Sequence, residues 1–197
     1  MSALFETSKA CQEVLRFRFP RYCQLPELEL YMDQVLGVVN QRLEVFAQKG
    51  EKLLTSAMVN NYVKKKLLPP AVGKRYPPGH VAHLLCICTL KPVLSISEIQ
   101  SLLALECQAL PQQQAYDQFG QLLEQALHAV FSSGRYDAPA PSDYPAQRLV
   151  QAAVFSFANK LYLQKYLAFQ AAQEALAGQQ EKAKQSPPKK KTKADAK

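Results

Sequence analysis

The spacing of apolar and polar residues along the chain predicts a mostly helical protein. From Leu28 to Gln48, apolar side chains recur every three or four residues, which indicates one amphipathic helix. A shorter helix is expected from Thr55, which can cap its first turn, to about Lys66. From Gly79 to about Lys91 both faces are apolar, so we expect this helix to be the most deeply buried.

Proline, glycine and capping residues mark the boundaries between these helices. Pro69-Pro70 and Gly73 end the second helix and predict a turn or small β wing. Ser95 and Glu98 form a capping box for a helix that runs through Leu103 or a little beyond. A helix after Pro111 should end near Gly134, and the segment Arg135–Pro145 is expected to be a loop.

The last predicted helix, Ala146 to about Leu176, has two apolar stripes. One stripe consists of Val150, Val154, Phe157 and Leu161, and the other of Phe155, Tyr162, Tyr166 and Phe169. A helix that is apolar on two sides needs two neighbours. The same helix of a second copy could supply one of them, which predicts a homodimer through Ala146 to Leu176. The alternative is a monomer whose N-terminal arm covers the second stripe.

We therefore expect an all-α fold with a small β wing and a C-terminal helical hairpin. The expected divisions are an N-terminal arm (1–27), a helix-turn-helix domain (28–107), a C-terminal helical segment for dimerisation or effector binding (108–180) and a disordered lysine-rich tail (181–197). The tail has no apolar residue larger than alanine with which to form a core.

Composition indicates the cellular compartment and shows how the net charge should be interpreted. No apolar run approaches the roughly 18 residues that cross a membrane, and no signal peptide pattern is present. Five cysteines without a regular framework are typical of a reducing compartment, so the cytoplasm is expected. The net charge is +8, but the tail supplies +5 of it, so DNA binding must be argued from where the remaining charges lie.

The segment with the most informative chemistry begins at Thr55. Its predicted helix carries Tyr62 and ends at Leu67-Leu68-Pro69, and Arg75-Tyr76 precede the next helix. With Ser97-Glu98-Ile99 inside the later capping box, this order resembles the winged helix-turn-helix of the MerR superfamily. Asn60 and Lys66 depart from it, standing where such proteins usually have arginine and glycine.

A second resemblance covers about residues 20 to 105. The segments that carry it are Leu25-Pro26, Leu30 to Val35, Met58 to Lys64 and Leu90 to Ile96. They are similar to a bacterial domain-of-unknown-function family with a MerR-like core. This resemblance implies a transcriptional regulator that binds double-stranded DNA.

These patterns assign candidate DNA contacts. The helix is expected to turn polar side chains outward, where asparagine can pair with adenine and lysine can reach guanine or phosphate. Basic and polar side chains of the wing are expected to contact phosphates. The candidate DNA-binding residues are Thr55, Ser56, Asn60, Asn61, Lys64, Lys65, Lys74, Arg75, Tyr76 and His80.

Other functions receive less support from the sequence. Lys64 to Lys66 could instead be a solvated helix end, or could serve a protein-interaction module that keeps the helix-turn-helix shape and binds an acidic partner. His80, His83, Cys86 and Cys88 cannot converge on one ion from a single helix, so no metal is expected. We find no catalytic motif and expect neither an enzyme nor a cofactor. The sequence does not identify an effector.

Overall fold

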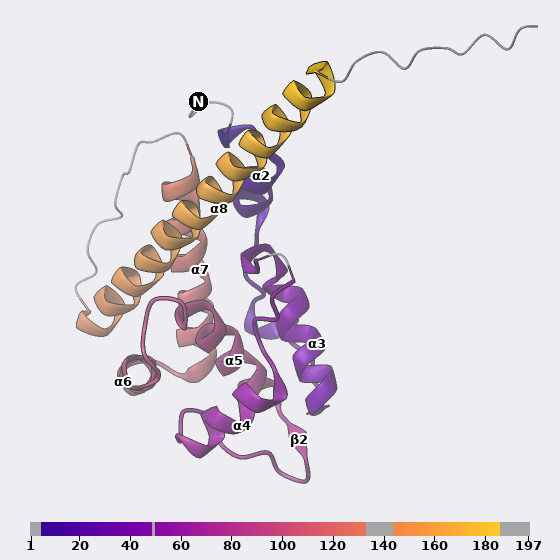
Figure 1. The fold of residues 1–197 in the computed structure, drawn as a ribbon. Helices are drawn as coiled ribbons and strands as arrows, with labels where there is room; N and C mark the ends of the chain where they lie inside the picture. Colours follow the sequence, from indigo (N-terminus) through magenta and orange to yellow (C-terminus); the bar gives the residue numbers. More distant parts are fainter. Residues whose placement is uncertain (1–4, 49, 133–143, 186–197) are drawn as a thin grey trace, which may run out of the picture.

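The computed structural model describes residues 5–48, 50–132 and 144–185 and is mostly helical, with one small antiparallel sheet (Figure 1). The elements in chain order are α2 (Lys9–Arg16), the 3-10 helix η1 (Tyr22–Gln24), β1 (Leu30–Tyr31), α3 (Met32–Arg42), the 3-10 helix η2 (Glu44–Phe46), α4 (Ser56–Lys64), β2 (Arg75–Tyr76), α5 (Pro78–Leu90), α6 (Ile96–Ala109), α7 (Gln112–Phe131) and α8 (Pro145–Gln185).

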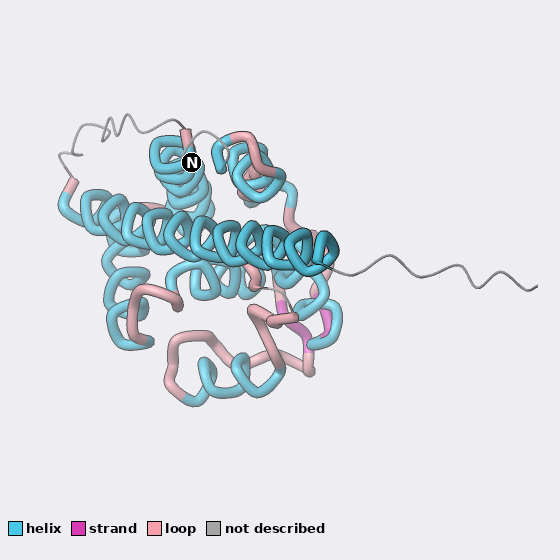
Figure 2. Tube along the Cα trace, turned by 45° about the horizontal axis from the view of Figure 1, so that its top comes forward, coloured by secondary structure: helices cyan, strands magenta, loops and turns pink. Residues whose placement is uncertain are grey.

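The long helix α8 crosses one side of the molecule, and α7 and α6 pack against it (Figures 1 and 2). Helix α2 packs on α7, and α5 lies between this layer and α3. Helix α4 and strand β2 lie together at the end of the molecule opposite α2 (Figure 1). This arrangement leaves α4 and the wing as one end of the protein.

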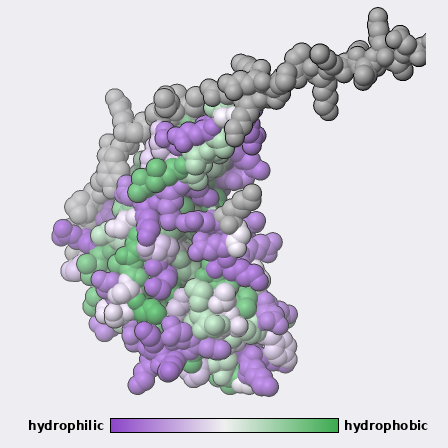
Figure 3. Space-filling model, viewed as in Figure 1, coloured by the Kyte–Doolittle hydropathy of each residue, from purple (hydrophilic) through white to green (hydrophobic). Residues whose placement is uncertain are grey.

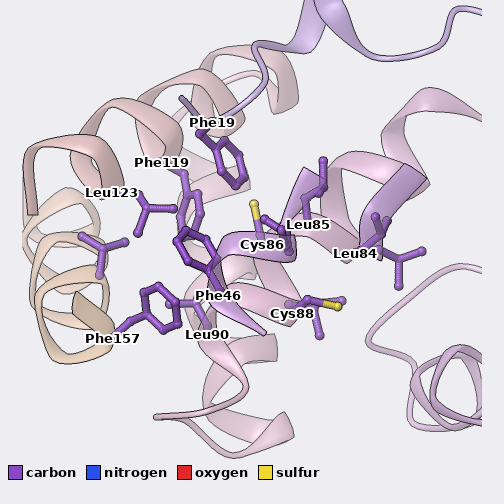
Figure 4. Close-up of a cluster of buried hydrophobic side chains, with 14 of the residues drawn as sticks. Phe19, Phe46, Leu84, Leu85, Cys86, Cys88, Leu90, Phe119, Leu123 and Phe157 are labelled. Carbon is purple, nitrogen blue, oxygen red and sulfur yellow. The ribbon is translucent and has the colours of Figure 1, made fainter. Parts of the chain in front are cut away.

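Helix α5 is the centre of the core, as the sequence predicts. Side chains from His80 to Leu90 are buried apart from the half-buried His83. Figure 4 shows Cys86 and Leu90 of α5 among Phe19, Phe119 and other apolar side chains from the neighbouring elements. The buried apolar residues form one cluster. It includes residues from each of the three described segments, from Phe5 to Leu161.

The predicted starts of two helices are confirmed in atomic detail. The Thr55 hydroxyl accepts a hydrogen bond of 3.3 Å from the Met58 amide, and α4 begins at Ser56. Ser95 and Glu98 form the reciprocal capping box that opens α6. Local side-chain-to-backbone bonding therefore sets where both helices begin.

The prediction of a single helix from Leu28 to Gln48 is wrong in its extent. Leu30–Tyr31 forms β1, which pairs with β2, and α3 covers only Met32–Arg42 before η2 turns the chain. The apolar spacing continues through the segment, but strand pairing with residues far along the chain replaces helix at its start.

The later helices are longer or shorter than their patterns indicate. Helix α6 was expected to run through Leu103 or a little beyond and ends at Ala109, and α7 ends at Phe131, before Gly134. Helix α8 continues past Leu176 to Gln185. The prediction that the tail is disordered from residue 181 is therefore wrong for residues 181–185, which are helical. Glutamate, lysine, alanine and glutamine are good helix formers, so the helix can continue through them. Gly134, most of the predicted loop 135–145, and residues 186–197 lie outside the described residues.

Both stripes of α8 have partners within the chain. Val154 and Leu161 of the first stripe are buried. In the second stripe, Tyr162, Tyr166 and Phe169 surround the fully buried ring of Phe5, with ring centroids 5.4, 5.1 and 5.6 Å from it. The N-terminal arm therefore covers the second stripe, as the monomer alternative expects, and the homodimer stays a prediction. Within the described residues, no helix combines the length and apolar character needed to cross a membrane.

Candidate nucleic-acid interface

Helix α4 presents a polar outer face because its apolar residues are turned inward. Val59 and Tyr62 are buried, with exposed fractions of 0% and 1%. The exposed residues of α4 and the position just after it include the predicted contacts Ser56, Asn60, Asn61, Lys64 and Lys65. Predicted contact Thr55 is half-buried, and its hydroxyl is engaged in the helix cap.

The end of α4 is closed by a lysine in a conformation that usually belongs to glycine. Lys66 has a φ of 58°, in the left-handed region. The Lys66 amide donates to the Val63 carbonyl at 3.0 Å, and the Leu67 amide donates to the Tyr62 carbonyl at 2.9 Å. This is the bonding of a Schellman cap, which satisfies the last carbonyls of the helix. Gln100 of α6 also donates a hydrogen bond of 3.3 Å to the Lys66 carbonyl.

The wing is a two-residue hairpin turn with a second lysine in the left-handed region. Val72 and Arg75 exchange backbone hydrogen bonds of 3.0 and 3.2 Å around the turn. Gly73 and Lys74, between them, have φ values of 57° and 63°. Two successive positive φ values are typical of a type I′ turn, in which glycine or asparagine is favoured. The turn leaves the Lys74 side chain exposed.

Arg75 is held against a tyrosine that sequence reasoning missed. Tyr31 in β1 pairs with Arg75 in β2, and Leu30 pairs with Tyr76. The Arg75 guanidinium lies 5.1 Å from the centroid of the Tyr31 ring, and its Nη2 donates a hydrogen bond of 3.2 Å to the Tyr31 hydroxyl. Both side chains are exposed. Nothing in the sequence around Tyr31 indicates this role, because the partner lies more than forty residues away.

Tyr76 and His80 differ from the other candidate contacts because they are buried. Their exposed fractions are 6% and 9%, and their rings meet edge to face with centroids 5.8 Å apart. His80 Nε2 lies 3.1 Å from the Pro69 carbonyl oxygen, a separation at which the ring N–H donates to it. Both residues therefore support the wing from within, and their burial removes them from the surface that could contact DNA.

A further positioning residue, Asn40 of α3, fixes the segment before α4. Its side-chain amide donates to the Leu54 carbonyl at 2.9 Å, and its oxygen accepts from the Leu54 amide at 3.0 Å. The Asn40 side chain therefore bonds to the backbone of Leu54 as a neighbouring strand would. These two bonds fix the position of the next residue, Thr55. Asparagine at a polar position of a predicted helix gives no sequence signal for it.

The segment from Lys52 to Ser97 carries charge of one sign, and the exposed Asp33 of α3 is an acid that lines a hollow beside its Thr55 and Ser56. Residues 52–97 contain no aspartate or glutamate, and their basic residues are Lys52, Lys64, Lys65, Lys66, Lys74, Arg75 and Lys91. All seven are exposed. Hydrophilic residues predominate over the end where α4 lies (Figure 3). Such a field attracts polyanions and raises their rate of association.

The histidines and cysteines of α5 serve packing. Among the described residues, no group of three or more His, Cys, Asp or Glu side chains could hold a metal ion. Burial raises the pKa of Cys88 to about 12 and also raises that of Cys86, so both remain neutral thiols in the core. Helix α5 therefore contributes buried packing beneath the candidate interface.

Comparison with known proteins gives one match. A family model described as a domain of unknown function, DUF1836, matches residues 20–119, which include α3 to α6 and every candidate contact. No curated protein and no solved structure matches the chain.

Proposed function

The chain belongs to the DUF1836 family, whose description assigns no function, and from its interface we propose that it binds double-stranded DNA as a transcriptional regulator. In this proposal Asn60, Asn61, Lys64 and Lys65 face the major groove. Lys74 and Arg75 contact phosphates on the flanking backbone. In this proposal the chain forms a MerR-like winged helix-turn-helix, with α4 as the recognition helix and the turn at Gly73 and Lys74, based on the β1–β2 pair, as the wing.

The observation that carries the proposal is the placement of lysine at two strained positions. Lys66 and Lys74 are the non-glycine residues with positive φ among the described residues. A side chain in the left-handed region costs about 1 kcal/mol relative to glycine, so folding alone favours glycine at both places. Both lysines are exposed and border α4 or the wing tip. Strain of this kind clusters at binding sites, and phosphate contact is a reason to keep the charge.

The homodimer completes the proposal, because helix-turn-helix proteins commonly bind paired half-sites as dimers. Phe5 covers one side of α8, but Leu149, Leu163 and Leu167, which share another side of the helix, remain 50% to 57% exposed. We propose that α8, between Ala146 and Leu176, pairs with its copy through this exposed side. Sedimentation of the full chain and of Leu163→Glu tests this, and the dimer is overturned if both sediment as monomers.

The rival function is a protein-interaction module, favoured by a second surface feature. A groove between α6 and α8 has a volume of about 480 Å³, with small residues and Leu94, Leu105 and Leu149 along it. Figure 3 shows hydrophobic residues exposed on the side where α6 and the start of α8 lie. A partner with an apolar helix could dock there while acidic residues meet α4.

Repeated selection from random-sequence duplex DNA at about physiological salt separates the two functions. The chain ending at Gln185 should be used beside the full chain, because the lysines after that residue bind DNA without sequence preference. Enrichment of a palindromic sequence, lost in Arg75→Ala and kept in Lys91→Ala, supports the regulator. Failure to enrich any sequence with folded protein rejects it in favour of the interaction module.

A further inference from the structure

An exposed leucine stands between two acids just before β1. Leu28 is 80% exposed, the largest exposed fraction of any large apolar side chain among the described residues. Glu27 and Glu29, on either side of it, are exposed as well. Neither carboxylate has an ion-pair partner within the part of the chain that the structure describes. Residues 27–29, here called the acidic knob, therefore present one apolar group between two negative charges.

The chain on both sides of the acidic knob is anchored. Leu25, just before it, is buried with an exposed fraction of 5%. Leu30, just after it, pairs with Tyr76 in the small sheet. A segment that is already held in one position loses little conformational entropy when it is bound. The acidic knob is therefore suited to docking as a rigid group.

The groove between α6 and α8 has an apolar lining that is open to such a group. Its volume is about 480 Å³, and the lining includes Leu94, Leu102, Leu105 and Leu149 together with alanines and serines. Leu105 and Leu149 are 42% and 50% exposed. A leucine side chain placed there would remove apolar surface of both partners from water.

Basic residues stand at both ends of the α8 wall of this groove. Arg148 lies one helical turn before the lining residue Ala152, and Lys160 lies one turn after the lining residue Ser156. Both basic side chains are exposed. Lys160 Nζ donates a hydrogen bond of 2.7 Å to the Pro92 carbonyl, which leaves two of its three N–H groups for another acceptor.

The acid among the lining residues is engaged within its own helix. Glu98 accepts a hydrogen bond of 2.7 Å from the Ser95 amide in the capping box of α6. Arg148 and Lys160 outweigh this single acid, so the surroundings of the groove carry a net positive charge. The groove and the acidic knob are thus complementary both in apolar surface and in charge.

The acidic knob and the groove lie on different sides of the molecule. Helix α6 and the start of α8 lie on one side, whereas α3 and β2 lie on the other (Figure 1). The acidic knob directly precedes β1, which pairs with β2. It therefore cannot reach the groove of its own chain.

We propose that the acidic knob of one copy of the chain docks into the groove between α6 and α8 of a second copy. Leu28 lies among the apolar side chains of the groove, and Glu27 and Glu29 pair with Arg148 and Lys160. A contact between two different surfaces leaves one knob and one groove free at the ends, so it can join copies in rows. This contact goes beyond DNA binding and does not depend on it.

The head-to-tail contact can be measured apart from the proposed α8 dimer. Both contacts reach Leu149, but Leu163 lies about 10 Å along α8 beyond Ser156, the last groove residue on that helix. Leu163→Glu therefore disrupts the α8 pair and keeps the groove. All chains in the test carry this change, so loss of the α8 dimer or of DNA binding does not decide the outcome.

Sedimentation velocity of the full chain over a range of concentrations tests the contact, and circular dichroism checks that each variant is folded. The knob variant adds Leu28→Ser, and the groove variant adds Leu105→Glu, which places a negative charge where the acids dock. Each variant alone should associate at least tenfold more weakly than the parent chain. An equal mixture should form one-to-one complexes and nothing larger, because one intact knob and one intact groove remain between the two chains.

Charge reversal tests the pairing of the acids. Glu27→Lys with Glu29→Lys should weaken association about tenfold. Adding Arg148→Glu and Lys160→Glu to the same chain should restore it. Leu176→Glu, which changes an exposed leucine outside the groove, should associate like the parent chain.

Two results would overturn the proposal. The first is a Leu163→Glu chain that sediments as a monomer at every concentration, which would leave the groove to a different protein. The second is a mixture of the knob and groove variants that forms no one-to-one complex.

Discussion

The guanidinium of Arg75 lies over the ring of Tyr31, with 5.1 Å between its central carbon and the ring centroid, and also donates a hydrogen bond to the tyrosine hydroxyl. The two residues face each other across the β1–β2 pair. An arginine held in this way loses less side-chain entropy when it meets a phosphate. Tyr31 is therefore a positioning residue for Arg75 in the proposed interface.

Arg75→Ala should weaken binding to every DNA sequence and reduce the slope of log affinity against log salt by about 0.9, the contribution of one phosphate contact. Tyr31→Leu should weaken binding less, and it should have no further effect when Arg75 is already alanine. Tyr31→Phe, which keeps the ring, should lie between. Fluorescence anisotropy at several salt concentrations measures these four variants beside the unchanged protein. Equal, additive effects of the two residues would show that Tyr31 does not act through Arg75.

Asn60→Ala and Asn61→Ala should lower discrimination between a selected site and a scrambled duplex. A side chain that pairs with a base edge contributes about 1 to 3 kcal/mol of discrimination, whereas a phosphate contact contributes equally to both duplexes. The ratio of the two affinities should therefore fall about tenfold or more in at least one of the variants. If both duplexes lose affinity in parallel, the asparagines do not contact bases.

Lys66→Gly should stabilise the protein by about 1 kcal/mol, because glycine adopts the left-handed conformation without steric cost. Lys66→Ala is the matched control, since it removes the same charge and keeps the strained Cβ. Urea denaturation should show a higher midpoint for Lys66→Gly than for Lys66→Ala, and both should bind DNA more weakly. Identical midpoints would argue against the Schellman geometry at the end of α4.

Local signals predicted much of the fold, and long-range contacts account for what they missed. Thr55 and Ser95 mark helix starts through bonds to residues three positions away, so their roles are readable from the sequence. The late start of the helix predicted from Leu28, by contrast, depends on the pairing of Leu30–Tyr31 with Arg75–Tyr76. A periodic apolar pattern contains no information about such a distant partner.

The candidate site divides in the same way. The outward face of α4 follows from helical spacing, and Asn60, Asn61, Lys64 and Lys65 are exposed as expected. The wing residues cannot be sorted by local pattern, because the burial of Tyr76 and His80 includes contacts with residues distant in sequence, such as Leu30 beside Tyr76 and Pro69 beside His80. Tyr31 and Asn40 were missed because each acts on a residue distant in sequence.

Glu106 predicts a pH dependence of stability. Burial raises its pKa in the folded protein above the usual value of 4.5, so the folded state binds a proton that the unfolded state has released. Its contribution to stability is full below about pH 4.5 and is lost as the pH rises through the folded-state pKa. Over that window the unchanged protein should lose stability relative to Glu106→Gln, which does not titrate. Denaturation midpoints that change in parallel with pH would exclude this role for Glu106.

Phe5→Ala tests whether the N-terminal segment covers α8 in solution. Phe5 is fully buried against Tyr162, Tyr166 and Phe169, so truncation should lower the free energy of unfolding by about 3 kcal/mol. Phe5→Leu keeps most of the volume and should cost less. The alanine variant also exposes three aromatic rings, which should increase self-association in sedimentation experiments beyond any dimer formed by the unchanged protein. An unfolding midpoint unaffected by Phe5→Ala would mean that this contact is absent, and the second stripe of α8 would then be open to another copy of the chain.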